Sequence, residues 1–272
     1  MDKLLFGISG LPLGNENSKF DYASGIRYVK SIGLDSMELL FVRSVNVTDK
    51  NKDAILKSKL ENGIYLSAHG SYYINLNSSE PEKQEQSIAR ILKGAKALGE
   101  VQGRSIVFHC GYYKNYSVED TYQRIMEKLN SMPYFNVDYR LETTGKKNQF
   151  GTLIELVSIC KEIKTCKLCI DFSHIHARYN GRLKTYEDFA DILHYVSEQL
   201  GKSALYDMHI HIAGINYNQN GEKNHLPLLE SDFNFVECLR ALKNYEVKGC
   251  VVAEGPLVEK DAILLKKTYE NL

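Results

Sequence analysis

The sequence predicts an α/β protein, a (β/α)8 (TIM) barrel that forms a single domain over residues 1–272. Three observations lead to this prediction. Short runs of β-branched, aromatic and aliphatic residues recur about every 30 residues, the length of one strand–helix unit. Amphipathic helical patterns lie between these runs, and no Pro-, Gly- or Ser-rich linker divides the chain. Alternating strands and helices of this kind are typical of a barrel with parallel strands.

The predicted strands are eight apolar runs, each short enough for a buried strand and each bounded by polar or turn-forming residues. The first is LLFGI and the last is GCVVAE, and the seventh, DMHIHIAG, alternates histidine with aliphatic residues. In chain order the runs cover residues 4–8, 36–41, 64–69, 105–109, 137–142, 167–171, 207–214 and 249–254.

The predicted helices follow the strands and carry recognisable end signals. Residues 20–33 end on Gly33, a residue that suits a helix C-terminal cap. Residues 80–100 have Pro81 near the start, where its missing N–H costs nothing. Further helical patterns cover residues 118–132, 150–163, 186–200, 231–245 and 259–272. A doubly wound open sheet is the alternative, but GISGLPLG after the first strand matches its glycine-rich phosphate turn poorly.

Composition excludes some classes of function. The chain is 43% hydrophobic and 25% charged, as in ordinary globular proteins, and 34 basic residues balance 34 acidic ones. A neutral chain has no global basic field to attract nucleic acid, although a local patch remains open. No apolar run approaches the ~18 residues of a membrane helix, and the N-terminal apolar run is too short for a signal peptide. We therefore expect a cytoplasmic protein with no membrane partner.

The six cysteines sit mostly inside apolar runs, which predicts buried free thiols. Cys166 and Cys169 have the spacing of a metal or redox pair. On a strand, however, residues three apart point to opposite faces. We therefore do not expect these two thiols to act together.

Histidines and carboxylates gather at the C-terminal ends of the predicted strands, where barrel enzymes place their chemistry. Any one of them alone is more often a packed histidine or a helix cap. Together they include six of the eight histidines, and crowded carboxylates need compensating positive charge. Imidazole and carboxylate ligands suit zinc or manganese. The residues are His69, His109, Glu142, Asp171, His174, His209, His211, His225 and Glu254.

These residues occur in motifs that resemble the endonuclease IV family of apurinic/apyrimidinic (AP) endonucleases, part of the xylose-isomerase-like barrel superfamily. The likeness runs from residue 6 to about residue 256. Its most specific block is HGSYYINL, which begins at His69, and the DFSH block at Asp171 is the second. The other blocks are FHCG, LETTG, HIAG, NH and AEGP.

The resemblance implies a cluster of zinc ions at the barrel mouth. Its first metal would be held by His69, His109 and Glu142, and these three residues are the predicted catalytic residues. The second would be held by Glu142, Asp171, His211 and Glu254, with His209 as the alternative to His211. The third would be held by His174 and His225. Tyr72 and Asn75, in the first block, are predicted to bind substrate.

One departure from the family concerns the third metal. The family has an aspartate two residues before the histidine that corresponds to His225, and this chain has Lys223 there, with Glu222 beside it. The sequence therefore predicts two or three zinc ions, with manganese as an alternative, and a weakened third site.

The resemblance implies a monomeric, zinc-dependent phosphodiesterase that incises DNA 5′ to abasic sites. Basic residues in the strand-end loops would contact phosphates, namely Lys114, Lys146, Lys147, Arg178 and Arg182. A sugar isomerase or epimerase is the first alternative, because it would need only one or two metals at Glu142, Asp171, His211 and Glu254. A non-catalytic protein that binds damaged DNA is the second alternative.

Overall fold

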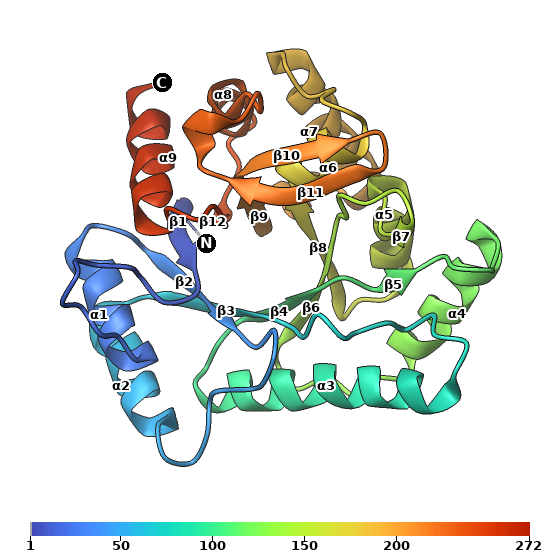
Figure 1. Cartoon of the computed structure of the whole chain (residues 1–272), viewed down its shortest axis with the longest axis horizontal. Coiled ribbons are helices and arrows are strands. Elements are labelled where there is room, and N and C mark those ends of the chain that lie inside the picture. The colour runs from blue at the N-terminus through green and yellow to red at the C-terminus, as the bar shows by residue number, and fades with distance from the viewer. Residues whose placement is uncertain (1) are drawn as a thin grey trace.

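Eight parallel strands close into a barrel, which confirms the predicted fold (Figure 1). The computed structural model describes residues 2–272. The first strand pairs with both the last and the second, and this closes the ring. In barrel order the strands are β1 (Leu4–Ser9), β2 (Ser36–Leu40), β3 (Tyr65–His69), β4 (Ser105–Phe108), β6 (Asp138–Glu142), β8 (Cys166–Asp171), β9 (Met208–Ile212) and β12 (Gly249–Ala253).

Helices surround the barrel, and local sequence signals set their ends. Pro81 occupies the first turn of its helix as predicted, and Thr152 forms a capping box with Glu155 at the start of another. The helices are α1 (Tyr22–Ser31), α2 (Lys52–Asn62), α3 (Pro81–Glu100), α4 (Val118–Asn130), α5 (Leu153–Glu162), α6 (Phe172–Arg178), α7 (Tyr186–Leu200), α8 (Phe235–Asn244) and α9 (Glu259–Asn271). Two 3-10 turns, η1 (Lys202–Tyr206) and η2 (Leu228–Glu230), complete the set within the described residues.

Two short sheets lie at the mouth of the barrel, and the sequence analysis did not predict them. β5 (Gly111–Tyr112) pairs with β7 (Gln149–Phe150), and this ties the loop after β4 to the loop after β6. β10 (Gly214–Asn218) and β11 (Gly221–Leu226) form an antiparallel hairpin that packs on α6. Figure 1 shows this hairpin in orange in front of α6 and the end of β9. The sequence predicts a loop for this segment, and the structure shows that it forms a hairpin that places His225 at the mouth.

The side chains that point into the barrel are more polar than those that point out from its strands toward the surrounding helices. Along β9, Met208, Ile210 and Ile212 face the surrounding helices, while His209 and His211 face inward, because side chains alternate along a strand. The hydrophobic core therefore lies mainly between the barrel and its helices. The interior instead holds buried polar groups in layers, which is the arrangement that positions the site.

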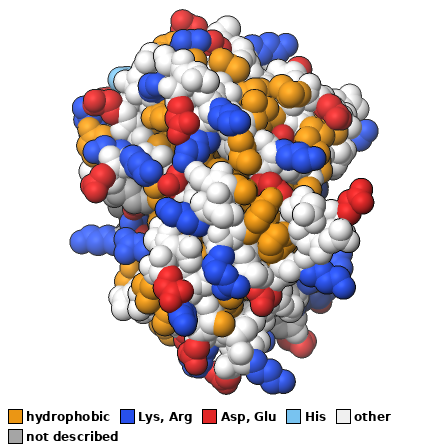
Figure 2. Space-filling view, turned by 90° about the vertical axis from the view of Figure 1, so that its left-hand side faces the viewer, with side chains coloured by type: hydrophobic (Ala, Val, Ile, Leu, Met, Phe, Trp, Pro, Cys, Tyr) orange, Lys and Arg blue, Asp and Glu red, His pale blue; other side chains and the backbone are white. Residues whose placement is uncertain are grey.

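The outer surface mixes both signs of charge, as the zero net charge predicts. Figure 2 shows basic, acidic and apolar side chains intermingled over the side of the molecule that lies at the left in Figure 1. Among the helices of the described chain, none combines the length and the apolar character needed to cross a bilayer.

Candidate metal centre

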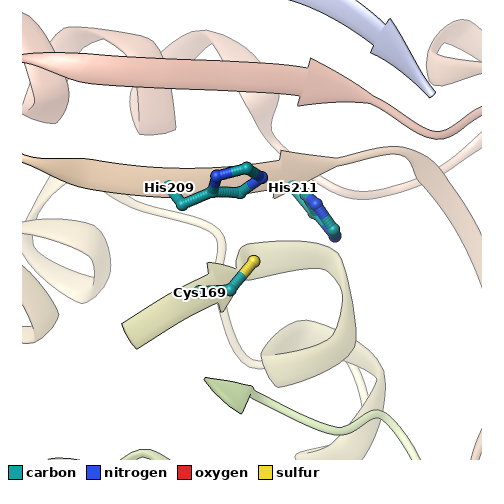
Figure 3. A group of neighbouring side chains, drawn as sticks. All are labelled: Cys169, His209 and His211. Carbon is teal, nitrogen blue, oxygen red and sulfur yellow. The ribbon is translucent and has the colours of Figure 1, made fainter. Parts of the chain in front are cut away.

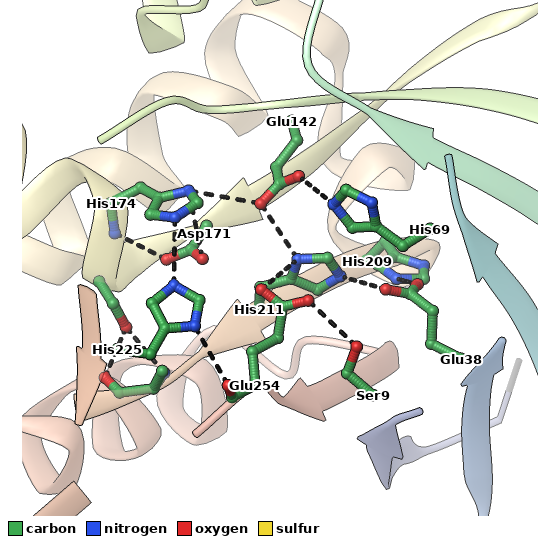
Figure 4. Close-up of polar contacts among 12 residues, drawn as sticks. Ser9, Glu38, His69, Glu142, Asp171, His174, His209, His211, His225 and Glu254 are labelled. Carbon is green, nitrogen blue, oxygen red and sulfur yellow. Dashed lines mark hydrogen bonds and ion pairs between the residues drawn. The ribbon is translucent and has the colours of Figure 1, made fainter. Parts of the chain in front are cut away.

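Side chains from six barrel strands, α6 and the β10–β11 hairpin converge at the mouth (Figure 4). All of them except Asp171 and His211 border a cavity of about 500 Å³. Each barrel residue lies within one position of the end of its strand, as the sequence predicts. The converging residues are His69, His109, Glu142, Asp171, His174, His211, His225 and Glu254.

Glu142 lies at the centre of the group and is fully buried. Its Oε2 atom is 3.0 Å from His69 Nε2 and 3.4 Å from His109 Nε2. Its Oε1 atom is 3.2 Å from His211 Nδ1. Burial alone would raise the pKa of Glu142, but the surrounding imidazoles, His109 first, hold it well below its usual range. Glu142 is therefore an ionised carboxylate whose two oxygens face two different sets of ligands.

His69, His109 and Glu142 form the first ligand group. His69 Nδ1 lies 3.0 Å from the Gly70 carbonyl, so this nitrogen donates and Nε2 is directed at Glu142. Burial lowers the pKa of His69, but Glu142 outweighs it and raises the pKa to about 9. His109 is different, because burial dominates and lowers its pKa to about 4. One imidazole is thus charged and the other neutral around a single carboxylate.

Glu142, Asp171, His211 and Glu254 form the second group, which places three carboxylates around one imidazole. Asp171 Oδ1 caps α6 by accepting from the His174 N–H, at 2.7 Å. Asp171 Oδ2 is buried and accepts no hydrogen bond within residues 2–272, and its ion-pair neighbour is His174 Nδ1 at 3.3 Å. Burial, together with Glu142 and Glu254, raises the pKa of Asp171 to about 6. An orphaned carboxylate oxygen beside two more carboxylates is the environment of a cation.

Asp171, His174 and His225 form the third group. The two histidines are its new members. Their Nδ1 atoms lie 3.0 Å and 3.1 Å from backbone carbonyls, of Thr143 and Glu254 respectively, so each Nδ1 must carry a proton and donate. When each ring is neutral, each Nε2 atom presents a lone pair, and these two atoms face one another at 3.4 Å. Two lone pairs directed at one another need a cation or a proton between them. Burial lowers the pKa of His174, but Asp171 and Glu142 outweigh it and raise the pKa well above its usual value, so a proton occupies this position in the metal-free protein.

Glu222, which the sequence analysis left without a role, completes the third group. Its Oε2 atom lies 3.6 Å from His174 Nε2, and its side chain lines the cavity. Strand pairing explains how it reaches the site. Asn224 pairs with Asn216, but Glu222 pairs with Tyr217, so Lys223 is an extra residue in the ladder. This bulge shifts the alternation of β11 and places Glu222, rather than Lys223, beside His225.

The donor set fits divalent metals. Imidazole nitrogens and carboxylate oxygens are the ligands of zinc and manganese sites. Asp171 Oδ2, which accepts no hydrogen bond, and the facing Nε2 atoms of His174 and His225 each mark a position where a cation can bind in place of a proton. Candidate clusters of this composition are therefore present in the structure.

Of the two predicted substrate-binding residues, one borders the cavity and one does not. Tyr72 is 66% exposed, and it lines both the main cavity and a smaller adjoining one. Its ring centroid is 6.1 Å from that of His69. Asn75 instead shapes its own loop, because its Oδ1 atom accepts from the backbone N–H groups of Asn77 and Tyr112. A substrate role for Asn75 remains a prediction.

The basic residues predicted to contact phosphate fall into two groups. Arg178 is 6% exposed, and its guanidinium donates to Thr144 Oγ1 at 2.9 Å and to the Gln149 carbonyl at 3.0 Å. It holds the loop after β6 in place, so the prediction that it binds phosphate was wrong. Lys146 lines the smaller cavity and is exposed, as are Lys114, Lys147 and Arg182.

The sequence prediction also misplaced one histidine. His209 does not reach the mouth, because it lies one inward position below His211, where its Nε2 atom is 2.9 Å from Glu38 Oε2. The choice of His211 over His209 agrees with this geometry. Glu38 was missed because it lies within β2 rather than at its end, although a charged residue inside an apolar run was a signal.

A closed barrel whose mouth gathers imidazoles and carboxylates defines the chain as a barrel protein with a candidate metal centre. The chain belongs to the xylose isomerase-like TIM barrel family, whose family model matches residues 26–268. Its curated relatives include probable endonucleases, and solved structures with the same fold include sugar epimerases and an endonuclease.

Two relatives illustrate the range of similarity. The uncharacterized protein MJ0133 of Methanocaldococcus jannaschii is 44% identical, over 99% of this chain and 98% of its own length. A probable endonuclease 4 of a Sulfurihydrogenibium species is 29% identical over 50% of this chain. That match spans 54% of the relative's length.

Two solved structures share the fold equally well. Endonuclease IV of Thermus thermophilus is 16% identical, with a TM-score of 0.73 and coverage of 98% of each chain. A D-tagatose 3-epimerase-like protein is 19% identical, with a TM-score of 0.73 and coverage of 98% of this chain and 96% of its own. Likeness at this level shows the fold and does not choose between the two activities.

Proposed function

We propose that this protein is a zinc-dependent phosphodiesterase that incises DNA 5′ to abasic sites, as an endonuclease of the endonuclease IV type. The observation that carries the proposal is the number of ligand groups at the mouth. Three groups adjoin one another and share Glu142 and Asp171. A centre with three adjoining ligand groups suits phosphodiester cleavage, where the attacking oxygen, the phosphate and the leaving oxygen each need charge stabilisation.

The proposal gives each group a role. His69, His109 and Glu142 hold the first zinc, and Glu142 extends its second oxygen toward the residues of the next group. Asp171, His211 and Glu254 hold the second zinc, and His174, His225 and Glu222 hold the third. Zinc in such a site activates water and stabilises charge on phosphoryl oxygens.

The protein's own residues would bind and orient the DNA. Tyr72 offers a flat, exposed face beside His69, where a ring can lie against the sugar of an abasic site. Lys146 lies at the adjoining cavity, where an ammonium group can contact a phosphate. The ordered loop after β6, held by Arg178, fixes the position of this lysine relative to the mouth.

A sugar epimerase is the second candidate, because Glu142, Asp171, His211 and Glu254 alone would suit a single divalent metal. The epimerase-like structure is as similar in fold as the endonuclease. That function leaves His69, His109, His174 and His225 without a task at the mouth. The facing Nε2 atoms of His174 and His225 therefore support the nuclease.

Incubation with a synthetic duplex that carries one abasic site tests the proposal. The zinc-loaded protein should cut the damaged strand 5′ to the lesion, and a chelator or Glu142→Gln should abolish the cut. An undamaged duplex and D-tagatose serve as parallel substrates. Epimerisation of the sugar without incision would favour the epimerase, and binding of the duplex without incision would favour a non-catalytic binding protein.

A further inference from the structure

A second layer of buried polar side chains lies inside the barrel beneath the mouth. It consists of Glu38 on β2, Ser67 on β3, His209 on β9 and Cys250 on β12, and all four are buried. None of them belongs to the three ligand groups proposed above. A carboxylate that is fully buried in a barrel interior is costly unless specific partners stabilise it.

Glu38 has such partners on each of its oxygens. Its Oε2 atom accepts a hydrogen bond from Ser67 Oγ at 2.9 Å and another from His209 Nε2 at 2.9 Å. Its Oε1 atom lies 3.1 Å from His211 Nε2. Neither of these last two atoms makes a hydrogen bond within the described residues, so the contact between them is a close ion pair. Glu38 and His211 therefore face one another alone at this contact (Figure 4).

His209 is held so that it can only donate to Glu38. Its Nδ1 atom lies 3.3 Å from the Cys250 sulfur, so the thiol S–H donates to Nδ1. The remaining nitrogen, Nε2, then carries the proton that it donates to Glu38. The result is a chain of contacts from Cys250 through His209 and Glu38 to His211.

The consequence falls on His211, which belongs to the second ligand group. A neutral imidazole has one N–H and one lone pair. Carboxylates face both nitrogens of His211. A metal that binds at the mouth would replace the proton on the nitrogen that faces it, while the carboxylate that faces Nε2 keeps the N–H on Nε2, so the lone pair is then on Nδ1. Nδ1 is the atom directed at the mouth, 3.2 Å from Glu142 and 3.3 Å from Glu254. Carboxylates behind ligating histidines fix the tautomer and the ring orientation in this way.

We propose that Glu38, held in place by Ser67 and His209, is the positioning residue for His211, and that it directs the Nδ1 lone pair of His211 at the metal of the second group. The inference rests on the metal centre of the proposed function but does not depend on any cleavage activity. It adds to that centre a carboxylate that belongs to a different layer of the barrel and never touches the metal.

An interior metal site is the competing explanation, because Cys169, His209 and His211 also lie close enough to share an ion (Figure 3). Such an ion would have to displace an existing contact, since both nitrogens of His209 already have partners, Glu38 and Cys250. The two explanations differ in the number of metal equivalents that the chain binds, so one titration separates them.

The test is a zinc titration of the metal-free protein in competition with a chromophoric chelator, with Glu38→Gln as the variant. Glu38→Gln should bind as many zinc equivalents as the wild type, with one of them weakened about 10- to 100-fold. A tenfold weaker zinc affinity means that saturating zinc stabilises the folded variant by 1.4 kcal/mol less than it stabilises the wild type. Glu119→Gln, on the exposed first turn of α4, is the matched control and should bind like the wild type.

A second variant keeps the proposal testable if Glu38→Gln fails to fold. Ser67→Ala removes one donor from Glu38 without touching His211, and it should weaken the same equivalent by a smaller factor. If each metal-free variant unfolds thermally near the wild-type temperature, its loss of zinc affinity does not come from a general loss of stability.

Three results would overturn the inference: zinc affinities equal to the wild type in both variants, no zinc binding by the wild type, or an extra equivalent that Cys169→Ala removes. Loss of zinc affinity in Glu38→Gln supports it even if the wild type fails to cut abasic DNA, so failure of the proposed function is distinguishable.

Discussion

Replacement of Glu222 by alanine should remove the third metal while leaving the other two in place. Glu222 Oε2 is 3.6 Å from His174 Nε2, and the Nε2 atoms of His174 and His225 are 3.4 Å apart. With bonds of about 2.0–2.1 Å, two ligands of a tetrahedral zinc ion lie about 3.3–3.4 Å apart. Both separations in the structure are close to these values, so His174 Nε2 can share an ion with His225 Nε2 and with Glu222 Oε2.

The magnitude follows from the number of ligands. Residues that only support a ligand typically contribute 10- to 100-fold to metal affinity. Removal of one ligand out of three should therefore weaken the third equivalent by about 100-fold or more, roughly 2.7 kcal/mol. The side chain of Glu222 borders the mouth cavity, so alanine there enlarges that cavity and does not create a new one in the hydrophobic core.

A zinc titration against a chelator of known affinity measures this loss directly. The wild type should show three equivalents and Glu222→Ala two. Lys223→Gln is the matched control, because Lys223 is the bulged, exposed residue of β11 and should not contribute. Unchanged binding by Glu222→Ala, or an equal loss in Lys223→Gln, would refute the argument that the bulge brings Glu222 to the site.

Three other outcomes follow from the same structure. The free energy of unfolding of the metal-free protein should fall by about 3 kcal/mol between about pH 6.5 and pH 9. Glu142 raises the pKa of His69 to about 9, and the charged pair is lost as pH rises through that value. Urea unfolding across that range measures this fall, and constant or rising stability would contradict it. Arg178→Met should destabilise the protein by about 3 kcal/mol, because it removes charge-assisted hydrogen bonds. Arg182→Met, at an exposed position, should change the stability by less than about 0.5 kcal/mol. Equal effects of the two substitutions would be inconsistent with a buried structural role for Arg178. Glu142→Gln should weaken both zinc ions that its two oxygens face, and metal analysis showing full occupancy would argue against a bridging position.

The barrel itself could be predicted because each strand is a compact apolar run with a clear end. The helix α2 lacked that kind of signal. Only Ile55 and Ser58 of α2 are buried, and the rest of the segment is largely charged or polar. The β10–β11 hairpin was hidden for a related reason, since its sequence is rich in Asn and Gly and its pairing contains a bulge.

The site was predictable where one residue ends one strand, as at His69, Glu142 and Asp171. It was not predictable where geometry depends on pairing or on depth. The bulge at Lys223 decides that Glu222 faces His174, and no periodicity in the sequence shows a bulge. Depth in the barrel decides that Glu38 supports a ligand instead of being one.

X-ray diffraction from zinc-soaked crystals, recorded at the zinc absorption edge, tests the central claim most directly. We expect anomalous peaks in three places: beside His69 and His109, between Asp171, His211 and Glu254, and between His174, Glu222 and His225. A mouth without peaks, or a single peak within the second group alone, would contradict a metal centre built for phosphodiester cleavage.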